Sequence, residues 1–315
     1  MPEPEQPPGA WLPTFPAPAA SPAWAAQLEA PPAHGDIAAL TIDLDAAEPW
    51  LDHHRPGGLP LLGTAMGIEL MMRAAMPVLG APAVQAAVVV DVSVRDPLIL
   101  QAQCAQVHVT MARAGAALLR CGVQHLAEGR APLRLFEANI GLAPGARRSS
   151  ERSPAFNERA EWSASASDVY ALFFHGPAFQ VVRRARYRSG GVLCELNTAL
   201  PPLTRAGGDE MAATPRWIEL CMQAAGLLEV AENARMMIPH RIDRIEWFVP
   251  EAAATGPLFA WARKRGPGDA GLVDVDLLDA HRQPVLHLRG YRTVPLPFAA
   301  DGAAVNRLHR CLSES

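Results

Sequence analysis

Hydrophobic and polar positions alternate along several short segments of the chain. Residues 36–45 (DIAALTIDLD) alternate apolar and polar side chains, as a half-buried strand does. In residues 63–80 (GTAMGIELMMRAAMPVLG), apolar side chains recur at helical spacing instead. Strand-like runs then occupy 87–94, 98–112, 116–126 and 133–142. One helix followed by a strand meander predicts an α+β plan and not an alternation of strands and helices.

The second part of the chain repeats this order of elements. Strand-like segments at 179–187 and 191–199 precede PRWIELCMQAAGLLEVAEN, which predicts a helix over Pro215–Asn233 with proline at its first position. Further strand-like runs occupy 242–249, 258–265, 272–279 and 284–294. The repeated order predicts a pseudo-duplicated fold in which each half wraps one long helix in a sheet, although the halves share no evident sequence identity.

Three segments fall outside these halves. Residues 1–36 are rich in Pro and Ala and predict an extended, disordered tail. Residues 146–160 are charged and contain Pro and Ser, which indicates a linker. We therefore expect an N-terminal half at 37–145, a C-terminal half at 161–298 and a C-terminal tail at 299–315.

Composition narrows the classes of function. The 315 residues carry a net charge of −4, which argues against an electrostatically driven nucleic-acid binder. No apolar run reaches membrane-spanning length, and the start of the chain lacks the features of a signal peptide. The five cysteines include no C-x-x-C pair, so neither a disulfide framework nor a zinc site is indicated. The cytoplasm is the expected location.

The common catalytic motifs for dinucleotide, phosphate, zinc-protease and serine-hydrolase chemistry are absent from the sequence. A histidine in a glycine-rich turn before an apolar helix stands out instead, within PWLDHHRPGGLPLLGTAMGIEL at 49–70. An imidazole beside the free N–H groups of a helix N-terminus suits proton removal next to a carbonyl, where a developing enolate oxygen needs stabilisation. A merely polar turn is the competing interpretation of this segment.

Four segments together resemble the dehydratase domains of polyketide synthases. PWLDHHRPGG resembles the segment that carries the family's catalytic histidine in an H-x3-G-x4-P pattern, with the histidine at His54 and the glycine at Gly58. HGPAFQ at 175–180 is similar to the G-P-x-F-Q signature. PRWIELCMQAAG and MIPHRIDRIEW are similar to the second catalytic helix and to the strand that follows it. The resemblance covers about residues 37–298 and implies a double-hotdog fold.

The resemblance also implies roles for individual residues. His54 would remove the α-proton of a β-hydroxyacyl thioester, and Glu219 would protonate the departing hydroxyl. Gln223, one helical turn further on the same face, would orient that acid or the hydroxyl. An acid that is protonated at neutral pH needs an apolar setting that raises its pKa, and we expect the neighbours of Glu219 to supply it. A histidine of ordinary pKa already suits the base. Substrate-binding roles are expected for Gly58, Gly63, His175, Gly176, Pro177 and Phe179.

The sequence departs from the family pattern in three places. Glu219 stands where Asp is usual, and the proline of the histidine motif is missing from its expected position in LPLLG after Gly58. His53 stands where Asp is common, and we expect it to face solvent. Relatives that shift double bonds can also lack the proline, so a double-bond isomerase or an oxa-Michael cyclase on the same fold is the first alternative. A non-catalytic module that binds acyl carriers is the second.

The implied elimination moves protons and not hydride, so no metal, nicotinamide or flavin cofactor is expected. The substrate would arrive on the phosphopantetheine arm of an acyl carrier protein, as a separate partner or within a polyketide synthase module. The resemblance also makes a homodimer plausible. No nucleic-acid or membrane partner is expected.

Overall fold

The computed structural model describes residues 37–81, 83–100, 104–115, 117–126, 130–143, 161–188, 190–205, 211–254, 256–266, 271–296 and 300–313. The predicted N-terminal tail and the predicted linker lie outside these residues. The strands of the first half are β1 (Ile37–Asp45), β2 (Ala87–Val94), β3 (Cys104–Gly115), β4 (Leu118–His125) and β5 (Leu133–Leu142). Those of the second half are β6 (Ala164–Ser165), β7 (Val182–Arg188), β8 (Gly191–Leu196), β9 (Met237–Trp247), β10 (Phe259–Lys264), β11 (Val273–Leu278) and β12 (Pro284–Pro295).

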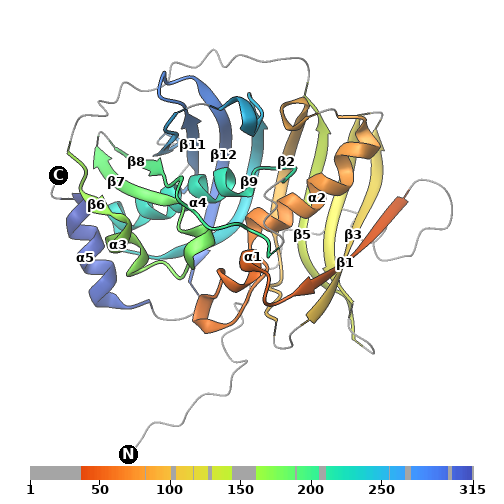
Figure 1. The fold of residues 1–315 in the computed structure, drawn as a ribbon, viewed down its shortest axis with the longest axis horizontal. Coiled ribbons are helices and arrows are strands. Elements are labelled where there is room, and N and C mark those ends of the chain that lie inside the picture. The colour runs from red at the N-terminus through yellow and green to blue at the C-terminus, as the bar shows by residue number, and fades with distance from the viewer. Residues whose placement is uncertain are drawn as a thin grey trace, which may run out of the picture.

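Two long helices form the centres of the two halves, α2 (Thr64–Leu79) and α4 (Pro215–Asn233). The shorter α-helices are α1 (Pro49–Asp52), α3 (Ala166–Tyr170) and α5 (Gly302–Ser313). Single 3-10 turns occur at η2 (Pro56–Gly58), η3 (Val84–Ala86), η4 (Pro177–Phe179) and η5 (Glu251–Ala253). Figure 1 shows the two halves side by side, with α2 lying across the strands of one half and α4 enclosed by those of the other.

All described strands belong to one antiparallel sheet, in the order β1-β3-β4-β5-β2-β9-β12-β11-β10-β8-β7-β6. Outward from the β2–β9 junction, the first half continues β5, β4, β3, β1 and the second half continues β12, β11, β10, β8. In each half, the junction strand is the one that directly follows the long helix in the chain. The two halves therefore share one topology, and the predicted pseudo-duplication and α+β double-hotdog plan are confirmed.

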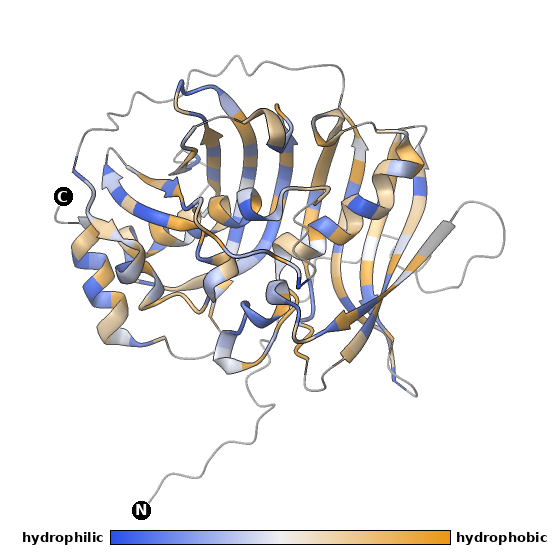
Figure 2. Ribbon diagram, viewed as in Figure 1, coloured by the Kyte–Doolittle hydropathy of each residue, from blue (hydrophilic) through white to orange (hydrophobic). Residues whose placement is uncertain are grey.

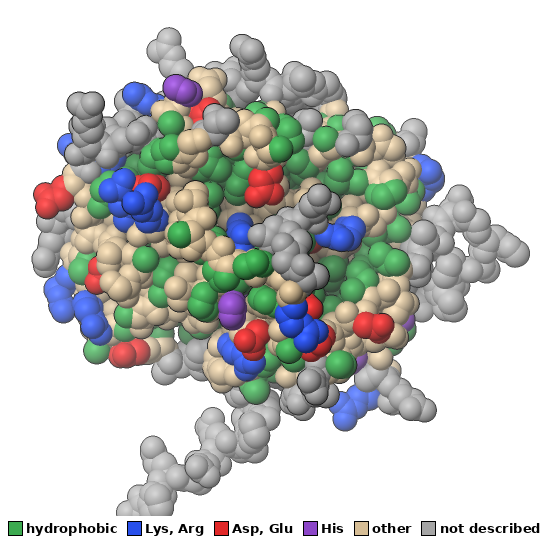
Figure 3. All heavy atoms as spheres, in the orientation of Figure 1, with side chains coloured by type: hydrophobic (Ala, Val, Ile, Leu, Met, Phe, Trp, Pro, Cys, Tyr) green, Lys and Arg blue, Asp and Glu red, His purple; other side chains and the backbone are tan. Residues whose placement is uncertain are grey.

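The central helices are buried on most of their surface because the sheet curls around them. In α4, the side chains from Trp217 to Ala225 are all shielded from solvent. Close packing of α2 depends on Gly67, where a Cβ atom would lie 2.5 Å from the ring of Phe136 on β5. Figure 2 shows hydrophobic and hydrophilic residues along the strands, and in the middle of β3 buried residues alternate with less buried ones, which places one face of that strand against α2. Charged side chains of both signs are interspersed over the face seen in Figure 3.

Most predicted elements occur where the sequence placed them, and the structure differs in three details. Residues 98–100 do not extend β3, because their backbone pairs with the loop before α2 through Leu62 N–H to Leu98 O and Leu100 N–H to Pro60 O. The short α3 was not predicted. The expected C-terminal tail contains α5, and two leucines on the apolar side of this helix, Leu308 and Leu312, are buried in the core. The ring of His309 lies 2.9 Å from the Val230 carbonyl of α4, which fastens α5 to the second half.

Candidate active site

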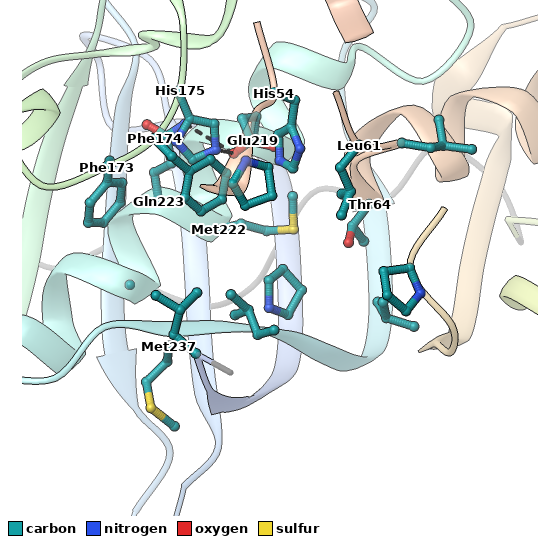
Figure 4. A pocket seen from close by; sticks show the side chains of 18 of the residues that line it. His54, Leu61, Thr64, Phe173, Phe174, His175, Glu219, Met222, Gln223 and Met237 are labelled. Atoms are coloured by element: carbon teal, nitrogen blue, oxygen red, sulfur yellow. Dashed lines mark hydrogen bonds and ion pairs between the residues drawn. The ribbon is translucent and has the colours of Figure 1, made fainter. Parts of the chain in front are cut away.

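A cavity of about 120 Å³ lies between the two halves and is bordered by residues of both. The first half contributes the loop before α2, the start of α2 and the end of β2. The second half contributes the loop after α3, one face of α4 and the beginning of β9. Figure 4 shows His54, His175 and Glu219 gathered at one end of this cavity and Met237 at the other. The site therefore exists only where the halves meet.

His54 is positioned by backbone pairing between segments far apart in the sequence. Its N–H donates to the Leu51 carbonyl of α1, and its carbonyl accepts the N–H of Leu61. His54 and His175 form an isolated antiparallel bridge, and Gly176 donates its N–H to the His53 carbonyl over 2.8 Å. The HGPAF turn of the second half is thus attached directly to the histidine loop of the first half.

The expectation that His53 faces solvent was wrong. Its ring is half-buried, and Nδ1 accepts the N–H of Ala178 over 2.9 Å. A Cβ atom at Gly176 would lie 2.9 Å from the Cβ of His53, so only glycine permits this approach. His53 therefore links the two halves from behind the site, while the adjacent His54 borders the cavity.

Glu219 and Gln223 lie one turn apart on α4 and both border the cavity, as their spacing predicted. The side-chain N–H of Gln223 donates to Glu219 Oε1 and to the Phe179 carbonyl, each over 3.0 Å. Gln223 Oε1 in turn accepts the hydroxyl of Tyr170 over 2.8 Å. These bonds fix the amide orientation, so that its N–H group points at the carboxylate.

His175 also contacts the carboxylate. Its Nε2 lies 3.0 Å from Glu219 Oε1, and both side chains are nearly fully buried. Phe174 stacks on the His175 ring with centroids 4.5 Å apart, and the His54 ring meets His175 edge-on at 5.2 Å. Two imidazoles and one carboxylate thus share the same end of the cavity.

Burial and, to a smaller extent, the nearby His175 lower the pKa of His54 to about 4, against the opposing effects of Glu219 and the carbonyls of Leu61 and His54. The sequence-based expectation of an ordinary histidine pKa was therefore wrong. Desolvation disfavours the imidazolium more strongly than the neighbouring carboxylate favours it. At neutral pH the ring is uncharged, which is the form that accepts a proton.

The expected rise in the pKa of Glu219 was also wrong. Burial does act to raise it, but the charge and hydrogen bond of His175, the charge of His54 and the hydrogen bond of Gln223 together bring it below its usual value. The apolar neighbours on α4 are present as predicted, with Trp217 and Ile218 fully buried. These apolar neighbours do not determine the direction of the pKa shift of Glu219, because two N–H donors converge on Oε1 and stabilise the carboxylate.

The residues predicted to bind substrate divide into two groups. His175 borders the cavity, and Gly63 lies against the His54 ring. Gly58, Gly176, Pro177 and Phe179 do not border it. Gly58 and Pro177 are exposed in short turns, and Phe179 is buried in the core with its carbonyl bonded to Gln223. The turn at η4 brings both parts of Phe179 to the site, because its carbonyl bonds Gln223 and its ring lies edge-on to the His54 ring with centroids 6.4 Å apart.

Sequence reasoning missed Tyr170 and Phe174, which support Gln223 and His175. Tyr170 is the last residue of the unpredicted α3, and its hydroxyl also accepts the N–H of Val182 over 2.7 Å. No motif marks either residue, because their roles depend on contacts across the second half. The largely apolar remainder of the cavity lining was not predicted either; it includes Met236, Met237, Ile238, Pro239, Tyr291 and Leu296.

Comparisons with known proteins agree with this geometry. A family model described as "Polyketide synthase dehydratase N-terminal domain" matches residues 144–303, and one described as "Polyketide synthase dehydratase domain" matches residues 27–124. The two matches together span both halves of the sheet and both sides of the cavity. A search of curated proteins returns no match.

Solved structures with the same fold are numerous. The dehydratase domain from the CurF module of curacin polyketide synthase is 17% identical with a TM-score of 0.71, over 84% of this chain and 96% of that one. A trans-AT polyketide synthase dehydratase domain from Brevibacillus brevis is 17% identical with a TM-score of 0.67, over 82% and 94%. The dehydratase domain of a mycocerosic acid synthase-like polyketide synthase is 21% identical with a TM-score of 0.65, over 83% and 92%. These likenesses show the double-hotdog fold.

The described residues contain neither a membrane-spanning helix nor a cluster of metal-binding side chains. None of the described helices is long and apolar enough to cross a membrane. Within the same residues, no group of three or more His, Cys, Asp or Glu side chains is arranged to hold a metal ion.

Proposed function

Because this chain belongs to the polyketide synthase dehydratase family, we propose that it removes water from a β-hydroxyacyl thioester to give the α,β-unsaturated thioester. One observation carries the proposal: the His54 imidazole of one half and the Glu219 carboxylate of the other border a single, largely apolar cavity. Elimination needs a base near the α-carbon and a proton donor near the β-oxygen; one half supplies His54, and the other supplies Glu219 with its partner His175.

His54 is the base in this proposal. Its ring is neutral at physiological pH, since its pKa lies near 4, so no proton has to leave before it can act. A thioester carbonyl beside the first turn of α2 would meet backbone N–H groups that have no partner within the helix, and Thr64 of that turn borders the cavity. Those donors and the positive end of the helix dipole stabilise the enolate oxygen that forms as the α-proton leaves.

The apolar wall formed by β9, Tyr291 and Leu296 suits an acyl chain. We propose that the substrate is carried on the phosphopantetheine arm of an acyl carrier protein, within a polyketide synthase module or as a separate partner. The reaction transfers protons only, so we expect it to need no metal or redox cofactor. We also propose that the protein is located in the cytoplasm and forms a homodimer.

A second reaction on this fold is favoured by one observation. The hydrogen bonds from His175 and Gln223 hold Glu219 as a carboxylate, and double-bond isomerisation requires less from the acid than dehydration does. An isomerase would use His54 to move a proton between the α- and γ-carbons. An oxa-Michael cyclase would use the same base. A non-catalytic carrier-binding module would need neither His54 nor Glu219.

Mass spectrometry of a β-hydroxyacyl pantetheine or carrier-protein thioester incubated with the protein tests the proposal. We expect loss of water with the wild type and at least 10²-fold slower loss with His54→Ala or Glu219→Gln. His281→Ala and Glu161→Gln, both at exposed positions, are the matched controls and should keep full activity. Double-bond migration in an α,β-unsaturated thioester without any dehydration would replace the proposal by the isomerase. If neither thioester reacts, the result would favour the non-catalytic carrier-binding module.

A further inference from the structure

Resting on the proposed dehydration, we propose that the proton given to the departing hydroxyl comes from Nε2 of His175, and that Glu219 holds His175 as its counter-ion. His175 would then be a second catalytic histidine, contributed by the opposite half from His54. The carboxylate at position 219 would not itself be the proton donor.

The hydrogen bonds of Glu219 carry this assignment. Oε1 is approached by two N–H donors, Nε2 of His175 and the amide of Gln223, each at 3.0 Å. Exchanging the nitrogen and oxygen of the Gln223 amide would break two further hydrogen bonds. The amide N–H group also donates to the Phe179 carbonyl, and the amide oxygen accepts the Tyr170 hydroxyl. A carboxyl oxygen that faces two donors is stabilised as the anion, and a carboxylate has no proton to give. The lowered pKa of Glu219 agrees with this geometry.

His175 is the ionisable side chain that both contacts the Glu219 carboxylate directly and borders the cavity. Its side chain is 6% exposed and borders the cavity, and Phe174 stacks on one face of the ring. Nδ1 is shielded from solvent and has no hydrogen-bond partner in the described structure, so Nε2 is the nitrogen through which a proton can be exchanged with a ligand. A substrate β-hydroxyl placed beside Oε1 of Glu219 would accept a hydrogen bond from the same Nε2–H group of His175 that points at the carboxylate.

The positions of the two histidines suit removal of groups from neighbouring carbons. Their ring centroids are 5.2 Å apart, and both rings border the same cavity. With His54 neutral, His175 protonated and Glu219 ionised, the three buried groups carry no net charge, which burial favours. The alternative with the same net charge has a protonated Glu219 and two neutral imidazoles, and the two arrangements predict different results below.

The proton balance of the step closes. His54 takes the α-proton as the C–H electrons form the new double bond, the Cβ–O bond breaks, and the oxygen leaves as water with the proton from Nε2 of His175. His54 is then protonated and His175 neutral. Return of one proton to His175 and loss of one from His54 restores the starting state with no net uptake.

His175→Gln tests the role, because its amide keeps a hydrogen-bond donor for Glu219 but carries no titratable proton. We expect dehydration of the β-hydroxyacyl thioester to fall at least 10²-fold. The same variant should eliminate acetate from a β-acetoxyacyl thioester at close to the wild-type rate, since that leaving group needs no protonation. His54→Ala should lose both reactions, and His281→Gln should keep both.

The outcomes separate this inference from the proposed function. If the wild type dehydrates no β-hydroxyacyl thioester, the proposed function fails first. If the wild type dehydrates but His175→Gln keeps its activity, or loses both eliminations equally, His175 is not the proton donor. Nitrogen-15 NMR of histidine-labelled protein gives an independent reading, with the His175 signals assigned by their loss in His175→Gln. We expect the shifts of an imidazolium at pH 7, and those of a neutral ring would overturn the assignment.

Discussion

A Cβ atom on Gly63 would lie 3.1 Å from Nε2 of His54, closer than such atoms normally pack. Gly63 is the residue that precedes α2, so the helix begins against the imidazole that we assign as the base. The identity of residue 63 therefore controls where the ring lies relative to the first turn of the helix.

Gly63→Ala should slow dehydration by up to about 10²-fold, because the His54 ring must shift by a few tenths of an ångström to admit the methyl group, and a full displacement of about 1 Å costs that much in rate. The effect should appear in kcat while the unfolding transition changes little, since the ring can tilt to accept a methyl group. Gly266→Ala is the matched control, because a Cβ atom there meets no atom within 4 Å. Equal activity in the two variants would show that the position of the His54 ring does not depend on Gly63.

The low pKa of His54 makes stability depend on pH in a defined direction. The folded-state pKa of His54 is about 4 and the ordinary pKa of histidine in an unfolded chain is 6.5, so the unfolded state binds more protons between these values. Stability contributed by the neutral ring is therefore present above pH 6.5, is lost as the pH falls toward 4, and changes no further below that. The expected loss between pH 7 and pH 5 is about 2 kcal/mol.

Urea unfolding at pH 7 and pH 5 measures this contribution. We expect the wild type to lose more stability over the interval than His54→Gln does, by about the same 2 kcal/mol. His281→Gln, at an exposed position, should lose as much as the wild type. An identical pH dependence in all three proteins would mean that His54 titrates normally in the folded state.

The long helices were predictable from the sequence because their signals are local. The bounds of α4 agree with the predicted Pro215–Asn233, since proline marks the first turn and apolar spacing marks the rest. Residues 98–100 were assigned to a strand because an apolar run gives no sign of its partner. Their partner is the loop before α2, 35 or more residues earlier in the chain, and only the folded structure reveals it.

The same distinction applies to the site. Motifs identified His54 and Glu219, but the contact between Glu219 and His175 depends on the bridge that joins residues 54 and 175. Both pKa expectations failed for this reason, because burial and converging donors are properties of the assembled halves. Residue types near Glu219 in the sequence describe its helix and not the turn that packs against it.

Gly67→Ala should destabilise the first half. A Cβ atom at this position would lie 2.5 Å from the Phe136 ring, so helix and sheet must separate or the ring must move. Overpacking of this kind costs about 1–3 kcal/mol, which thermal or urea unfolding resolves. Phe136→Leu in the same chain should recover part of the loss by making room for the methyl group. If the double variant were as unstable as the sum of the single variants, the contact would not be the cause.

Glu69 connects the halves through a buried carboxylate, and its removal should weaken both stability and catalysis. Glu69 is 1% exposed on α2, and its two oxygens accept the N–H groups of Ala212 and Ala213, over 2.8 and 2.6 Å, just before α4 begins. Glu69→Gln replaces one acceptor with a donor that faces an N–H group, at a cost of about 1–3 kcal/mol. Because α4 carries Glu219, we also expect slower dehydration.

Arg73→Ala is the control for Glu69→Gln, since Arg73 pairs with the same carboxylate from a side chain that is 52% exposed. Its loss should cost less than about 1 kcal/mol, because water screens an exposed partner. Urea unfolding and the dehydration assay on both variants separate the two contributions. A Glu69→Gln protein as stable and active as Arg73→Ala would show that the ion pair, and not the backbone bonds to residues 212 and 213, sets the contribution of Glu69.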